Sequence, residues 1–547
     1  MQRNPAGILR WLFDPRFGPE GRLVPRWIFL RLLAAIYFSA FYALLFQIRG
    51  LIGPDGVSPA GRYLALVQRS FPTGRFWFAP TLLWLSSSNA MLMALCWIGL
   101  AASVVALFNL WPRLSFFLCF VCYLSFVAAA SEFSGYQSDG MLLEAGFIAL
   151  FFIPAGVLPG WGENPPSRAS LFLLQWEWFR IYFESGMVKL LSGDPEWRHL
   201  TAMDEYYQNG PLPTWVGWYV EHLPHWFHVS TAAATLGMEL GLVLLLFFGR
   251  RARLICFCIV TPWEIGVILT ANYTFLNYLV LSLGFLLLDD RSLVRFVPAR
   301  RRPRAAVETD VGEPEGAERP VSLFQPQETA DEPPLEHRKP SHFAAMRLAV
   351  TAVMLTWVGY ATLAELIRMP FSESVLPMAP VSMLEPFRIA NQYGLFAVMT
   401  RGRYEIEFQG SADGANWIAY PFRNKPQALN QAPGIYAPYQ PRFDWNLWFA
   451  SLGGWRDNEM VPITEERLLV GDHDVLSLFR SDPFPRVPPR YVRAVLWQYW
   501  FTSMREKRRT GDWWRRETLG LYAPELTMTA DGNFAVVEWP AELPPHD

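Results

Sequence analysis

Residues 27–48 read WIFLRLLAAIYFSAFYALLFQI, an apolar stretch in which Arg31 is the single charged residue. About 20 mostly apolar residues are enough to cross a bilayer as a helix. Arg31 lies near the start of the stretch, where its long side chain can reach the membrane surface. The stretch is too long for the apolar part of a cleavable signal, and no small-residue cleavage site follows it. It therefore predicts a transmembrane helix.

The composition of the whole chain agrees with a membrane protein. Charged residues make up 18% of the 547 residues and hydrophobic residues 52%, whereas soluble domains carry about 25% charged residues. The charges are scarce before residue 290 and dense after it. This pattern excludes a disordered chain and a disulfide scaffold. The net charge of −2 gives no reason to expect a nucleic-acid partner.

Further apolar stretches follow the first one along the chain. They cover residues 89–110, 114–131, 140–158, 168–191, 229–248, 252–271, 274–289 and 343–367. We therefore predict a polytopic α-helical membrane bundle of about nine spans, with a membrane domain at 27–304 and a last transmembrane helix at 341–369. Between them, residues 305–340 are rich in Glu, Pro and Arg, which predicts a disordered cytoplasmic linker.

Three arginine-rich segments predict the orientation of the chain, because positive residues favour the cytoplasmic side of a membrane. They are the N-terminal segment 1–26, the loop 249–253 and the loop 291–304. Nine spans with a cytoplasmic N-terminus place all three on the cytoplasmic side. The same count places the loop 192–228 and the tail 370–547 outside.

The tail reads as a soluble, β-rich domain. Residues 403–409 alternate in the manner of a strand, and a turn at 411–416 separates them from a second strand at 417–422, which predicts a hairpin. Later strands are expected at 491–501 and 513–522, and helices at 444–452 and 465–479. We expect a sandwich-like α+β domain.

Charged residues inside a membrane are costly, so each of them marks a candidate site. The candidate intramembrane network comprises Asp139, Glu144, Glu177, Arg180, Glu184 and Lys189. Arg180 and Glu184 are four residues apart and can pair on one helix face. Glu144 needs a partner, for which Arg180 and Lys189 are the candidates. The network is either a set of structural ion pairs or a catalytic pocket in which Lys189 acts as a base.

The outer loop 192–228 is rich in aromatic residues and histidine. The candidate surface residues there are Trp197, Asp204, His225, Trp226 and His228. His222, His225 and His228 are three residues apart, a spacing that spreads them around a helix, and Pro224 interrupts them. We therefore expect no metal site, and membrane-surface aromatic residues explain the loop. No motif of a soluble enzyme is found in the chain.

Several segments together resemble the lipase maturation factor family. They are QSDGMLLEAGF at 137–147, Arg180 to Lys189, WRHLTAMD at 197–204, QNGPLPT at 208–214, NYTFLNY at 272–278, NQYGLFAVMT at 391–400 and PYQPRFDW at 438–445. The similarity spans about 130–290 and 385–525. It implies a membrane-bound, chaperone-like factor that assists folding of secreted lipases through its non-cytoplasmic C-terminal domain.

Some features depart from the animal members of that family. The outer segments contain no cysteine, and the final residues carry no retention signal. The Arg- and Ala-rich composition is that of a bacterial member, so we expect an integral protein of a bacterial inner membrane, or of the endoplasmic reticulum if the source is eukaryotic. We expect membrane lipid and a secreted lipase or other exported protein as partners, and no cofactor.

A second resemblance concerns residues 182–190, YFESGMVKL, with Trp197 shortly after. This segment is similar to the membrane domain of vitamin K-dependent γ-carboxylases. The resemblance implies that Lys189 is a catalytic base lining a lipid or quinone pocket. The sequence thus leaves two hypotheses: a non-enzymatic folding factor, which we favour, and an integral-membrane enzyme or lipid-binding protein centred on Lys189.

Overall fold

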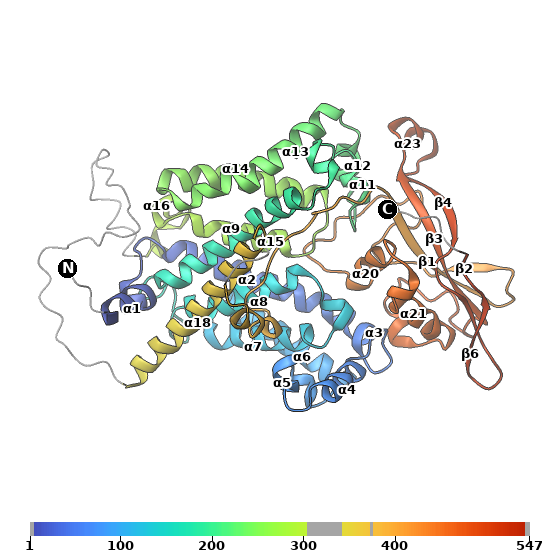
Figure 1. Ribbon diagram of the computed structural model, residues 1–547, viewed down its shortest axis with the longest axis horizontal. Coiled ribbons are helices and arrows are strands. Elements are labelled where there is room, and N and C mark those ends of the chain that lie inside the picture. Colours follow the sequence, from blue (N-terminus) through green and yellow to red (C-terminus); the bar gives the residue numbers. More distant parts are fainter. Residues whose placement is uncertain (1–4, 304–341, 372–375, 542–547) are drawn as a thin grey trace, which may run out of the picture.

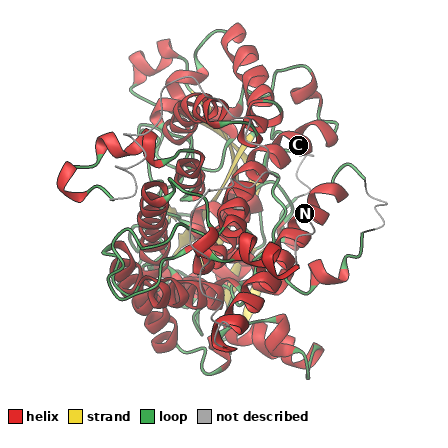
Figure 2. Cartoon of the chain, turned by 90° about the vertical axis from the view of Figure 1, so that its left-hand side faces the viewer, coloured by secondary structure: helices red, strands yellow, loops and turns green. Residues whose placement is uncertain are grey.

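The computed structural model describes residues 5–303, 342–371 and 376–541. A long helical bundle occupies one part of the molecule and a β-sheet lies at the opposite end (Figure 1). Seen from the helical end, the helices lie in front and the strands behind them (Figure 2). The predicted linker 305–340 lies outside the described residues.

The centre of the bundle is built from apolar helices. α2 (Leu23–Leu45) packs along α6 (Asn89–Leu107), and α6 packs along α7 (Pro112–Val127). α8 (Gln137–Phe152), α9 (Arg168–Leu191) and α15 (Leu276–Gly284) complete this core. The starts of two helices are capped by serine, because the Ser88 hydroxyl accepts a hydrogen bond from the Met91 N–H and the Ser167 hydroxyl accepts one from Ser170.

The remaining helices lie around this core or in the tail. Those of the bundle are α1 (Pro5–Phe13), α3 (Ile48–Ile52), α4 (Ala60–Ser70), α5 (Arg75–Phe78), α10 (Pro195–Arg198), α11 (Tyr206–Asn209), α12 (Trp215–Glu221), α13 (His225–Leu240), α14 (Arg250–Thr270), α16 (Asp290–Leu293) and α18 (His342–Arg368). Those of the tail are α19 (Ala379–Ser382), α20 (Arg442–Ala450), α21 (Met460–Leu469), α22 (His473–Leu476) and α23 (Met504–Thr510).

Each of the nine predicted spans coincides with a helical segment, but the count of nine spans is not confirmed. Among the described residues, five segments are long and apolar enough to cross a membrane: Leu23–Leu45, Asn89–Leu107, His225–Phe247, Arg250–Thr270 and His342–Arg368. α7 and the segment 276–287 are apolar but shorter. α8 has only 16 residues, and α9 carries four charged side chains between Glu177 and Lys189.

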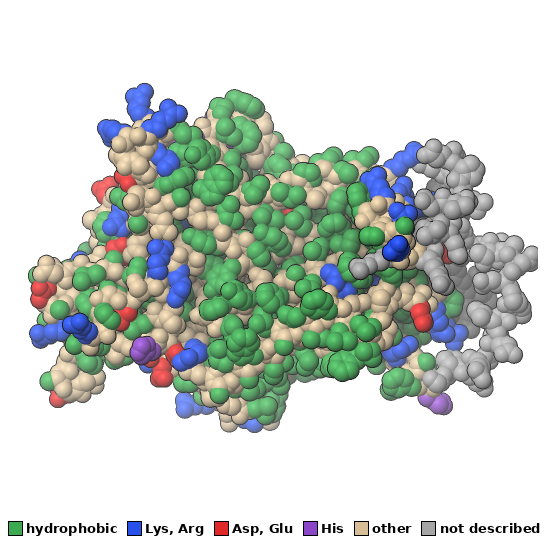
Figure 3. Space-filling view, turned by 180° about the vertical axis from the view of Figure 1, so that it is seen from behind, with side chains coloured by type: hydrophobic (Ala, Val, Ile, Leu, Met, Phe, Trp, Pro, Cys, Tyr) green, Lys and Arg blue, Asp and Glu red, His purple; other side chains and the backbone are tan. Residues whose placement is uncertain are grey.

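A broad apolar surface covers the face of the bundle seen in Figure 3, between two ends where charged side chains gather. α14 contributes to the exposed apolar surface with side chains such as Leu254, Ile259 and Leu269. At the end opposite the sheet, Arg250 pairs with Asp289, and the Arg22 guanidinium donates to the Leu288 carbonyl. The three arginine-rich segments therefore meet at one end of the bundle (Figure 1).

The tail contains one six-stranded sheet, not the two packed sheets expected of a sandwich. Its strands are β1 (Arg403–Ser411), β2 (Trp417–Ala419), β3 (Tyr491–Phe501), β4 (Trp514–Leu521), β5 (Glu525–Met528) and β6 (Phe534–Glu538), in the order β2-β1-β3-β5-β6 with β4 also paired to β3. All pairs are antiparallel. The apolar residues of β1 are covered by helices: Phe408 packs against Phe443 of α20 and against Phe479 after α22.

The predicted hairpin is confirmed, because Gln409 pairs with Ala419 and Ser411 with Trp417. The turn is held by Asp413, whose carboxylate accepts hydrogen bonds from the Ala415 and Asn416 N–H groups. The single helix expected at 465–479 is wrong. Gly471 has φ of +69° and separates α21 from α22.

Candidate functional site

The six predicted network residues do not form one network. They fall into separate clusters where the bundle meets the tail, and in two of these clusters the partners come from the tail. The tail approaches the bundle through residues 391–402, which we name the connecting segment, and through the start of α20. Because sequence reasoning paired the charges only with one another, it missed these partners.

Asp139, at the start of α8, pairs with Arg442 of α20 through two contacts. Arg442 Nη1 lies 2.7 Å from Oδ2 and Nη2 lies 2.8 Å from Oδ1 of the carboxylate. The Tyr123 hydroxyl donates to the same carboxylate over 2.6 Å. Asp139 and Arg442 are both fully buried. Burial alone would lower the pKa of Arg442. The neighbouring Asp139 and Tyr123 have the larger effect and raise this pKa. Such a two-pronged pair fixes orientation as well as distance.

Glu144 pairs with Arg180, as one of the two sequence alternatives predicted. Both side chains are buried, and both also bind Asn391 of the connecting segment. The Asn391 N–H donates to Glu144 Oε2 over 3.0 Å, and Arg180 Nη1 donates to the Asn391 carbonyl over 2.5 Å. The side-chain amide of Asn391 reaches the Gly140 carbonyl over 3.0 Å. Asn391 thereby links α8 to α9.

Glu184 also binds the connecting segment. Its Oε2 accepts a hydrogen bond of 2.6 Å from the Tyr393 N–H, while Oε1 lies 3.7 Å from Arg180 Nη1. The predicted pair of Arg180 and Glu184 is therefore present but is the longer of the two ion pairs of Arg180. Gln137 of α8 exchanges two hydrogen bonds with Gly394. Glu177 is equally buried but forms no ion pair with any described residue.

Lys189 lies apart from these clusters and pairs with Glu239 of α13. Its ammonium nitrogen is 2.8 Å from both Glu239 oxygens and 2.6 Å from the Ser185 hydroxyl. It also lies 5.1 Å from the centre of the Trp197 ring. The ammonium of Lys189 is therefore held by a carboxylate, a hydroxyl and an aromatic face, and its side chain is buried.

The outer-loop residues divide into two groups. His225 and Trp226 are exposed, and the His225 ring lies 2.9 Å from Asp204. Trp197 and His228 are buried, so the expectation that they belong to a surface is wrong. The connecting segment covers Trp197, whose indole N–H donates to the Phe396 carbonyl, and the His228 ring packs against Tyr207. Among the described residues, no group of three His, Cys, Asp or Glu side chains could hold a metal ion.

Further contacts join the tail to the same end of the bundle, and we name all the contacts between bundle and tail the junction. The buried Arg403 of β1 donates to the Gln208 and Pro211 carbonyls. The Asn272 side chain binds the backbone of the tail at Gly434 and Tyr436. These partners come from the segments QNGPLPT, NYTFLNY and PYQPRFDW, or lie next to them. The motifs that carry the family resemblance are thus largely those that join the tail to the bundle.

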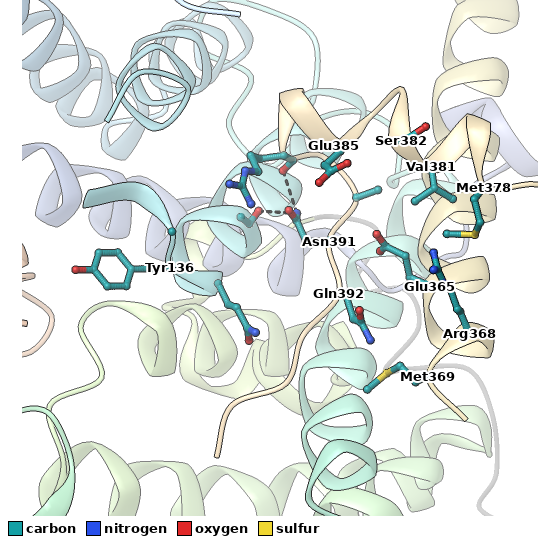
Figure 4. A pocket seen from close by; sticks show the side chains of 15 residues that line it. Tyr136, Glu365, Arg368, Met369, Met378, Val381, Ser382, Glu385, Asn391 and Gln392 are labelled. Carbon is teal, nitrogen blue, oxygen red and sulfur yellow. Dashed lines mark hydrogen bonds between the residues drawn. The ribbon is translucent and has the colours of Figure 1, made fainter. Parts of the chain in front are cut away.

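A pocket of about 600 Å³ opens beside the Asn391 cluster (Figure 4). It is lined by the first turn of α8, the end of α18 and residues 378–392. Lys189 does not line it. The catalytic pocket expected around Lys189 stays a prediction.

The fold and the contacts between bundle and tail define a class of protein. It is a polytopic membrane bundle whose C-terminal β-rich domain is fixed to one end by buried ion pairs. Two family models match the chain in the same order, the lipase maturation factor transmembrane domain at residues 24–295 and the lipase maturation factor C-terminal domain at 389–524. The chain belongs to the lipase maturation factor family.

Relatives of known name match over most of their length. Lipase maturation factor 2 of Gallus gallus is 32% identical, over 93% of this chain and 83% of the relative. Lipase maturation factor 1 of Mus musculus is 30% identical, over 100% of this chain and 95% of the relative. No solved structure matches the chain. The similarity of residues 182–190 to γ-carboxylases stays a prediction from sequence.

Proposed function

We propose that this protein is a membrane-bound maturation factor that assists the folding of secreted lipases, or of other exported proteins, on the non-cytoplasmic side of its membrane. The observation that carries the proposal is the match to both family domains over nearly the whole chain. The relatives are named lipase maturation factors, and the same client class is proposed here.

The geometry supports a non-enzymatic role. Four buried charges of α8 and α9 bind the tail, namely Asp139, Glu144, Arg180 and Glu184. Lys189 is engaged by Glu239 and Ser185. A general base needs a free position beside the proton that it removes. The fixed junction would instead present the sheet and its loops to a client at a constant distance from the membrane.

The arginine-rich end of the bundle supports the proposed orientation. It lies opposite the sheet (Figure 1), and positive residues favour the cytoplasmic side. The N-terminus would then be cytoplasmic and the tail outside, in a bacterial inner membrane or in the endoplasmic reticulum. Engineered cysteines test this orientation in the protein expressed in a bacterial inner membrane. A maleimide that does not cross the inner membrane should label Asp531→Cys in intact cells and Arg291→Cys only after lysis. The reverse labelling pattern would contradict the orientation.

The function is tested by deleting the gene in its native cell and measuring a secreted lipase of that cell. We expect the lipase activity per amount of lipase protein to fall, and the wild-type chain to restore it. Transcript level is the control, because a maturation factor acts after synthesis. An unchanged activity per lipase in the deletion strain would refute the proposal for that client.

A further inference from the structure

The pocket beside Asn391 combines charged, amide and apolar groups at the end of a membrane helix. Glu365 and Arg368 belong to the last turns of α18, one of the five segments long and apolar enough to cross a membrane. Glu385 and Arg388 line the other wall, together with Asn391. Figure 4 shows Glu365 and Arg368 extending from α18 and Asn391 and Glu385 coming from the opposite wall.

The charged groups of this pocket form no ion pair at contact distance within the described part of the chain. Arg368 and Arg388 form no ion pair with another described residue. Glu365 Oε2 is buried and has no hydrogen-bond partner there. At the contacts between bundle and tail, the buried carboxylates of Asp139 and Glu144 are paired with arginine. A buried carboxylate oxygen without a partner can accept a hydrogen bond from a bound group.

The surroundings of the pocket are apolar. Met369, Met378 and Val381 line it, and the nearby side chains of Leu363, Phe371 and Met383 are exposed. An end of a membrane helix that carries both cations and exposed apolar side chains matches a molecule with a charged head and a hydrocarbon tail. Arginine is suited to phosphate because its guanidinium offers several donors in one plane, and a carboxylate is suited to an ammonium group.

We propose that this pocket binds a phosphate ester that also carries an ammonium group, with Arg368 and Arg388 on the phosphate and Glu365 and Glu385 on the ammonium. A phosphatidylethanolamine headgroup has this chemistry, and its acyl chains would lie over Phe371 and Met383. Soluble phosphoethanolamine has the same chemistry without the chains. The site is distinct from Lys189, and it does not depend on the client proposed above.

Native mass spectrometry of the full chain in detergent tests the proposal with phosphatidylethanolamine, phosphatidylglycerol and soluble phosphoethanolamine. We expect retained phosphatidylethanolamine adducts whose apparent affinity falls at least tenfold in Arg368→Gln/Arg388→Gln. Phosphatidylglycerol, which lacks the ammonium, should lose affinity in the same variant but not in Glu365→Gln/Glu385→Gln. Binding of phosphoethanolamine at equal affinity would assign the site to the free ester, whereas its absence would assign it to the lipid.

Arg508→Gln on α23, remote from the pocket, is the matched control and should bind like the wild type. Arg368 is exposed, so the single variant Arg368→Gln keeps the test open if the double variant does not fold. Unchanged phosphatidylethanolamine binding in the folded double arginine variant, or in folded Arg368→Gln where the double variant does not fold, would overturn the proposal. Equal loss of both lipids in the glutamate variant would overturn the assignment of the ammonium.

Discussion

Arg442 of the tail and Asp139 of the membrane bundle form an ion pair through two contacts, and both side chains are buried. The residues are 303 positions apart in the chain. The rings of Phe126 and Tyr136 pack near the guanidinium. The pair therefore couples the stability of the tail to that of the bundle.

Replacing Arg442 by Met should destabilise the protein strongly. It leaves the Asp139 carboxylate buried without its cation, and breaking a buried pair on one side lowers the free energy of unfolding by about 3–5 kcal/mol. Thermal unfolding in detergent, followed by tryptophan fluorescence, measures the effect. Combining the change with Asp139→Asn should recover part of the loss.

The matched control is the pair of Arg250 and Asp289, in which the arginine side chain is 48% exposed and the aspartate is partly buried. Arg250→Gln should lower the free energy of unfolding by about 1 kcal/mol or less, because surface pairs contribute little. Equal losses in Arg442→Met and Arg250→Gln would contradict a structural role of the buried pair.

The helices and the hairpin could be predicted because their signals are local. The apolar stretch at 27–48 and the alternation at 403–409 each express a short-range pattern. The partners of Asp139 and Glu184 could not be predicted in this way. Arg442 and Tyr393 lie hundreds of residues away from them, and no periodic pattern connects the two ends of each contact. The one sequence signal that pointed to Arg442 was its place within PYQPRFDW, a segment that resembles the family.

Gly140→Ala should loosen the junction at Asn391. A Cβ atom at residue 140 would lie 2.7 Å from Asn391 Oδ1 and 2.9 Å from its Cγ, so the amide that binds Glu144 must move. Overpacking of this kind lowers the free energy of unfolding by about 1–3 kcal/mol. Gly237→Ala on α13 is the control, since nothing lies within 4 Å of its added Cβ. The prediction fails if both variants unfold at the wild-type temperature.

Asp444 of α20 should make the stability of the protein depend on pH. Burial raises the pKa of Asp444 to about 6, although Lys425 and the Asn424 N–H lower it. The folded state therefore binds more protons than the unfolded state between pH ~4, near the unfolded aspartate pKa, and pH ~6. The free energy of unfolding should fall as pH rises through this window, by up to about 3 kcal/mol from this group.

Asp444→Asn tests the assignment, because the amide keeps an oxygen for the Asn424 N–H but does not titrate. The difference in unfolding free energy between wild type and Asp444→Asn should change between pH 4 and 6 and stay level above pH 7. The exposed Asp531→Asn should leave the wild-type profile unchanged. A constant difference across the whole window would exclude Asp444 as the source.

Lys189 distinguishes the folding factor from the membrane enzyme. Lys189→Met removes the cation from the partly buried Glu239, so we expect little protein in the membrane and poor lipase maturation. In Lys189→Met/Glu239→Gln the unpaired charge is gone, and a structural lysine predicts that both accumulation and lipase maturation return. Glu239→Gln alone is the control for the second change. If the double variant accumulates to wild-type amounts and lipase maturation is still lost, Lys189 has a chemical role and the non-enzymatic function is wrong.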